Sequence, residues 1–197
     1  MNELTTCVEE YLQHHTPEFG SDPILARMLL DALVSSSPEG RAVSSDGSLY
    51  IFDGAVWNRV EHNDLISMAL LFDGLWLPGD KPKRLTVGLA KAQAVANTVL
   101  LIHEIKKDKF FNKVLPGVAD KNGFWVIDEF GAEMLEHSPD NLCTWSYDFQ
   151  IDPKAEPVKW LNFLRSLWRD DDDKDSKIAA IQEWLGCCLT GKSTAYS

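Results

Sequence analysis

Residues 186–193 match, letter by letter, the pattern of a phosphate-binding loop. They read Gly-Cys-Cys-Leu-Thr-Gly-Lys-Ser, which is a glycine, four residues and then Gly-Lys-Ser. Such a loop holds phosphates only between a strand and a helix, because backbone N–H groups and the helix N-terminus must face the ligand. The residues before Gly186 instead carry apolar side chains at helical spacing. We therefore interpret Gly186–Gly191 as a helix end rather than a nucleotide site.

A stretch of lysines interleaved with phenylalanines is the best candidate for contact with nucleic acid. Ammonium groups can follow phosphates, and exposed aromatic rings can stack on unpaired bases. The alternative, which the pattern favours, is that the lysines solvate a helix end while the phenylalanines belong to the core. The residues concerned are Lys106, Lys107, Lys109, Phe110, Phe111 and Lys113.

A second, smaller basic cluster consists of Lys81, Lys83 and Arg84. These side chains could face DNA, or they could form a polar lead-in to a long helix that follows. Both interpretations stay open from the sequence.

No arrangement of residues predicts a catalytic set or a metal site. The contiguous carboxylates Asp170 to Asp173 do not alternate as ligands do around calcium, so we expect a solvated loop with a helix cap. The cysteines lack metal-ligand spacing, and we expect four reduced thiols. We expect most of the seven tryptophans to be buried, because their apolar area is large. The cysteines are Cys7, Cys143, Cys187 and Cys188.

The charge of the chain restricts how it could bind nucleic acid. Its 197 residues carry a net charge of −11, which argues against wholesale wrapping of DNA. Residues 1–119 hold 11 basic and 15 acidic side chains, whereas residues 120–197 hold 8 and 15. Contact with DNA is thus more plausible in the first part. There is neither an apolar run of membrane-spanning length nor a secretory start, so we expect a cytoplasmic protein without a membrane partner.

Periodicity predicts an α+β fold, mostly helical with two small β-hairpins. One hairpin turns at Asp53-Gly54 and the other lies within residues 124–136, next to Asn122-Gly123, a pair that tolerates positive φ. A third strand is expected in the segment that begins at Ser146. A winged-helix-like element over residues 61–136 is a further interpretation. Helices are expected over residues 4–15, 22–33, 64–72, 85–105, 157–168 and 178–190.

Several short motifs follow one another in a recognisable order. They are Asn122-Gly123 before a strand, Leu135 with His137-Ser138-Pro139-Asp140, Asp152-Pro153, Pro157 with Trp160 and Leu164, and Gln182 through Gly191. In this order they resemble the poxvirus-type N-terminal domain of phage and plasmid primase–helicases. The resemblance covers residues 46–197, and residues 1–45 are expected to form a helical lead-in.

The resemblance implies an accessory domain for DNA replication that lies beside a superfamily-3 helicase motor. It implies no catalytic residues or cofactor here, with ATP and Mg²⁺ belonging to a downstream motor. Expected partners are that motor or a primase region of the same protein, a second copy of the chain, and single- or double-stranded DNA. The alternatives are a stand-alone DNA-binding or adaptor module, and a small nucleotide hydrolase that uses residues 186–193.

Overall fold

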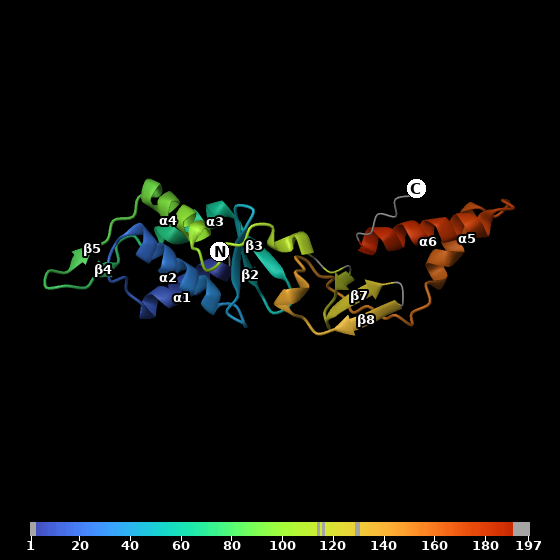
Figure 1. The fold of residues 1–197 in the computed structure, drawn as a ribbon, viewed down its shortest axis with the longest axis horizontal. Coiled ribbons are helices and arrows are strands. Elements are labelled where there is room, and N and C mark those ends of the chain that lie inside the picture. Colours follow the sequence, from blue (N-terminus) through green and yellow to red (C-terminus); the bar gives the residue numbers. More distant parts are fainter. Residues whose placement is uncertain (1–2, 114, 116, 129–130, 191–197) are drawn as a thin grey trace. The chain divides into compact units, whose positions relative to one another are not determined.

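The computed structural model describes residues 3–113, 115, 117–128 and 131–190. The chain forms two compact units and passes between them more than once (Figure 1). Helices and small antiparallel sheets are segregated along the chain, which confirms the predicted α+β class. Unit 1 comprises Met1–Val114 and Ser138–Trp145, and unit 2 comprises Leu115–His137 and Ser146–Ser197.

Four helices form the main body of unit 1. Their buried face is built from small and medium apolar side chains, such as Ala92, Val95 and Val99 of the fourth helix, which let neighbouring helices approach closely. The second and third helices both pack on the fourth. The helices are α1 (Glu3–His14), α2 (Asp22–Ser35), α3 (His62–Leu70) and α4 (Leu89–Leu101), with the 3-10 turns η1 (Phe110–Lys113) and η2 (Pro139–Asn141).

Two helix starts differ from their predicted positions. Helix α3 begins at His62, with Glu61 at the N-cap position, two residues before the expected start at residue 64. Helix α4 begins after Gly88 and ends at Leu101, so it is shorter than the predicted span of residues 85–105. At the start, the Leu85 N–H donates to the Leu75 carbonyl at 2.8 Å instead of joining the helix, and at the end Ile102 has non-helical backbone angles.

A three-stranded antiparallel sheet covers part of unit 1, in the order β1-β2-β3. The predicted Asp53-Gly54 turn is confirmed, with the Asp53 carboxylate accepting the N–H groups of Ala55 and Val56. The other turn, Asp46-Gly47, was not predicted, although both residues have the positive φ of a tight hairpin. The expected boundary at residue 45 falls at this turn, between two paired strands. The strands are β1 (Ala42–Ser45), β2 (Ser48–Phe52) and β3 (Trp57–Val60).

A separate two-stranded ribbon lies between α3 and α4 and was also not predicted. It pairs β4 (Trp76–Leu77) with β5 (Lys83–Arg84). Residues 61–114 belong to unit 1 and residues 115–136 to unit 2, so one winged-helix-like element does not span residues 61–136.

Unit 2 contains a second three-stranded antiparallel sheet and two helices. Its predicted hairpin is confirmed with one additional strand before it. Gly123 is not among the glycines with positive φ; a Cβ there would collide with the backbone oxygen of Leu135 on the paired strand. The elements are β6 (Gly117–Ala119), β7 (Phe124–Asp128), β8 (Gly131–Leu135), α5 (Val158–Leu167) and α6 (Lys174–Thr190).

The expected third strand after Ser146 is wrong. Ser146 makes only an isolated bridge with Ala119, and Tyr147 donates its N–H to the Ala119 carbonyl. The chain then leaves the sheet edge, because the N–H of Ile151 turns inward to the buried carboxylate of Asp120 at 2.7 Å.

The tryptophans are less buried than expected. Trp57 is almost fully buried, whereas four others are exposed. The acidic loop before α6 is largely exposed, as expected of a solvated loop. In addition, Lys177 pairs with Asp171 and Asp173 at 2.7 and 2.9 Å. No disulfide joins the four cysteines in the described part of the chain. The exposed tryptophans are Trp76, Trp145, Trp160 and Trp184.

Candidate nucleic-acid interface

The structure places the predicted contact residues in two groups within unit 1, at the two ends of α4 (Figure 1). The ribbon precedes the helix and carries Lys81, Lys83 and Arg84. The segment after the helix carries Lys106, Lys107, Lys109 and Lys113. A helix of 13 residues spans about 20 Å, so the two groups are separate anchor points rather than one cluster.

The ribbon stands on a firmly bonded base. The N–H of Gly74 donates to the Leu85 carbonyl at 2.9 Å, and Leu85 donates to Leu75 at 2.8 Å. The Asp73 carboxylate accepts the N–H of Val87 at 2.8 Å and so fixes the exit toward α4. Leu77 and Leu85 pack against the main core of unit 1. The paired strands are therefore held in place although each has only two residues.

Trp76 and Arg84 are directly opposite each other in the ribbon. The guanidinium carbon of Arg84 lies over the indole, 5.0 Å from the ring centre, in a cation–π contact. The Trp76 side chain remains 53% exposed. The sequence analysis did not identify this tryptophan as a candidate. Its position between a glycine-containing turn and a run of basic residues could have indicated it.

Backbone hydrogen bonds attach the second group to strand β1. Ser44 donates its N–H to the Ile105 carbonyl at 2.8 Å and accepts the N–H of Lys107 at 2.9 Å. The Ser44 hydroxyl donates to the Leu100 carbonyl at 2.8 Å, and Ser45 Oγ accepts the N–H of Phe110 at 3.2 Å. The lysines of this segment thus project from a backbone that is fixed to the sheet.

Phe110 and Phe111 are half-buried in an aromatic cluster of unit 1. Phe110 meets the ring of Trp57 edge-on at 5.4 Å, and Phe111 contacts Tyr50 at 4.5 Å between ring centres. Packing is therefore one role of this pair, as the favoured interpretation expected. The ammonium group of Lys107 lies 5.3 Å from the Phe110 ring centre, while the four lysines remain exposed.

Positive charge is concentrated in the segment that contains these two groups. Residues 81–113 hold eight lysines and arginines against two acidic residues, within a chain of net charge −11. One of the two, Glu104, is neutralised by Arg27 at 3.2 Å. Among the residues that the structure describes, no ion pair involves the basic side chains at either end of α4.

The segment that resembles a phosphate loop is helical where it is described. Gly186 to Thr190 continue α6, which begins at Lys174, so no strand precedes them. Lys192 and Ser193 lie outside the described residues. The backbone N–H groups needed for a phosphate cradle are used within the helix as far as Thr190.

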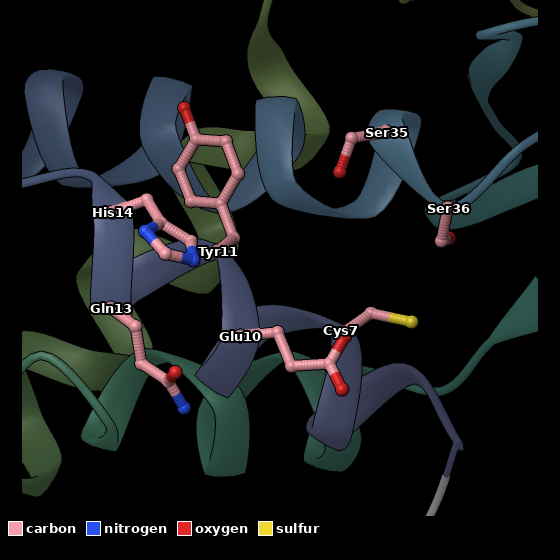
Figure 2. Close-up of a pocket in the computed structure, with 7 residues that line it drawn as sticks. All are labelled: Cys7, Glu10, Tyr11, Gln13, His14, Ser35 and Ser36. Atoms are coloured by element: carbon pink, nitrogen blue, oxygen red, sulfur yellow. The ribbon is translucent and has the colours of Figure 1, made fainter.

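A polar hollow of about 530 Å³ lies where α1 meets the end of α2 (Figure 2). The hydroxyls of Ser35 and Ser36 donate to the backbone carbonyls of Ala32 and Leu33. Burial, and then the charge of Asp31, raise the pKa of Tyr11. Both serine hydroxyls are thus bonded to the backbone rather than to a base among the lining side chains. The lining residues are Cys7, Glu10, Tyr11, Gln13, His14, Ser35 and Ser36.

Two further properties of the described residues bear on the site. No group of three histidine, cysteine or acidic side chains is placed to hold a metal ion in the parts of the chain that the structure describes. None of the described helices is long and apolar enough to cross a lipid bilayer.

No protein-family model matches this chain, and no curated protein is similar enough to count as a relative.

Proposed function

We propose that this chain is a non-catalytic accessory domain of a replicative helicase or primase–helicase, and that unit 1 contacts DNA through residues 81–113. The observation that carries the proposal is the charge of this segment. Its eight basic side chains oppose only two acidic ones, although the whole chain is strongly acidic. Affinity for DNA comes largely from neutralising phosphates, so DNA is expected to meet this segment first.

The proposal is supported by the hydrogen bonds that hold the backbone of both basic groups in place. The lysines after α4 are attached to β1, and the basic residues of the ribbon are supported by its bonded base. A separation of about 20 Å along α4 corresponds to several phosphates, since each strand of B-DNA carries one per 3.4 Å. Two anchor points at this spacing could hold one strand or one side of a duplex.

Unit 2 is proposed to contact protein. Helix α5 exposes Val158, Phe163 and Leu167, and α6 exposes Trp184. Apolar side chains grouped on a helix are typical of protein contacts. The partner that we propose is the ATP-driven motor region that the resemblance implies.

A binding experiment between the chain and the motor region tests this contact. Capture of the motor region by the wild-type chain would support it, provided that changing Phe163 and Leu167 to serine abolishes the capture. A module that binds DNA but not the motor would instead be stand-alone.

DNA contact is tested by fluorescence anisotropy with a labelled oligonucleotide. Two triple variants, Lys81/Lys83/Arg84→Ala and Lys106/Lys107/Lys109→Ala, should each weaken binding strongly at low salt. The matched control changes Lys154, Lys159 and Arg165 of unit 2 to alanine, which alters net charge equally with exposed residues. Equal weakening by all three variants would show that only net charge matters, and absence of binding by the wild type would overturn the proposal.

A further inference from the structure

The β4–β5 ribbon carries an exposed tryptophan that the fold does not need for its core. The side chain of Leu77 packs inward, whereas its neighbour Trp76 lies on the other face of the strand and is 53% exposed. Other tryptophans of the chain are exposed too, so exposure alone carries no argument. Trp76 is distinguished by the Arg84 guanidinium over its ring and by its place in a ribbon that also carries Lys81 and Lys83.

We infer that Trp76 is a base-stacking residue, and that the ribbon therefore binds single-stranded DNA in preference to duplex. This inference rests on the proposed function of unit 1. An indole offers a flat apolar face on which an unpaired base can stack, whatever its sequence. In a duplex the base faces are already stacked on one another and are not available to a side chain.

The contact with Arg84 orients the Trp76 ring before a base binds. Because Trp76 and Arg84 are opposite each other in the ribbon, both lie on the same face, and the guanidinium lies over the indole. The cation–π contact holds the ring orientation, so less rotamer freedom is lost when a base stacks. A guanidinium beside a stacked base is also well placed to bind the adjacent phosphate.

The charges around the ring complement a nucleic-acid strand rather than an acidic or apolar protein. Arg84 shares the face of the ring and Lys81 lies in the turn, whereas Lys83 is paired with Leu77 and so lies on the other face. Asp80 is the single acidic residue of the ribbon and its turn. Lys91 of α4 donates to the Gly20 carbonyl at the ribbon base and is thereby engaged in holding the fold. The combination of a fixed aromatic ring and exposed cations is the usual composition of a single-strand binding surface.

The test compares three variants of the full chain on a labelled single strand of about 15 nucleotides and on the matching duplex. Trp76→Leu should weaken single-strand binding about 5- to 150-fold and leave duplex binding unchanged. Trp76→Phe, which keeps an aromatic face, should retain most of the affinity. Trp160→Leu is the control, because Trp160 is an exposed tryptophan of unit 2.

The possible results separate this inference from the proposed function. If Trp76→Leu binds single strands as the wild type does, while Lys81/Lys83/Arg84→Ala weakens binding, the stacking role is wrong and the DNA-binding function stands. Equal loss on single strand and duplex would assign Trp76 to groove contact and would also overturn the inference. If the wild type binds neither substrate, both proposals fail. Thermal unfolding of each variant checks that the fold is retained.

Discussion

The carboxylate of Asp120 accepts a 2.7 Å hydrogen bond from the backbone N–H of Ile151, a residue 31 positions later in the chain. The same carboxylate accepts the indole N–H of Trp125 at 2.9 Å and the N–H groups of Asn122 and Gly123. Asp120 is only 1% exposed. A buried charge is tolerated here because several donors replace its hydration. This one side chain joins the β6–β7 turn to the segment that leads to α5.

Removing this carboxylate should destabilise unit 2. Asp120→Ala leaves four donors without their acceptor, and we expect a loss of about 3 kcal/mol in the free energy of unfolding. Hydrogen exchange of the Ile151 amide, together with chemical unfolding, measures the effect. Asp148→Ala is the matched control, because Asp148 is an exposed carboxylate of the same unit. Equal stability of the two variants would contradict the role given to Asp120.

The same carboxylate should make the stability of unit 2 depend on pH. Burial acts to raise the pKa of Asp120, but the hydrogen bonds from Ile151, Trp125, Asn122 and Gly123 outweigh it and leave the pKa below its usual value. The folded state therefore binds this proton less readily than the unfolded state. Its stabilising contribution is fully present above the unfolded pKa of about 3.9 and is lost as pH falls through the lower folded pKa.

The measurement for this prediction is chemical unfolding from neutral pH down through the acid range, for the wild type and Asp120→Asn. The wild type should lose more stability than the variant as the pH falls, because the amide does not titrate. Parallel curves for the two proteins would contradict the prediction.

Lys109 has φ of +58°, a left-handed conformation that disfavours side chains other than asparagine and aspartate. Lys109→Gly removes that strain at some cost in unfolded-chain entropy, and we expect a net gain of about 0.5 kcal/mol in stability. Lys109→Ala keeps the strain and is the control. Both variants should bind DNA more weakly than the wild type. Thermal unfolding measures the stability and anisotropy measures the DNA affinity. A glycine variant no more stable than the alanine variant would show that the backbone at Lys109 is not strained.

The sequence predicted the parts of the fold that local patterns determine. Asp53-Gly54 and the alternation over residues 124–136 located two hairpins, and apolar periodicity located the helices. Asp46-Gly47 carried the same type of signal and was missed, because the serines on either side lack the apolar alternation of a strand. Strands of two residues, as in the ribbon, are too short to have any periodicity.

Burial was harder to predict than secondary structure. The helix expected over residues 157–168 is present as α5, yet only Leu164 of that helix is buried while Leu167 is exposed. Periodicity shows which side chains share a face of a helix. Whether that face is buried depends on contacts with residues distant in the sequence. The same limit concealed Trp76, whose outward position depends on Leu77 packing inward.

The dependence of DNA affinity on salt tests the central claim, that residues 81–113 of unit 1 bind DNA through its phosphates. For a single strand, the slope of log K against log salt changes by about 0.7 per phosphate contact. We predict a steep slope for the wild type, reduced in magnitude by about 2 in Lys81/Lys83/Arg84→Ala and again in Lys106/Lys107/Lys109→Ala. A slope near zero, or one that neither variant alters, would contradict the claim.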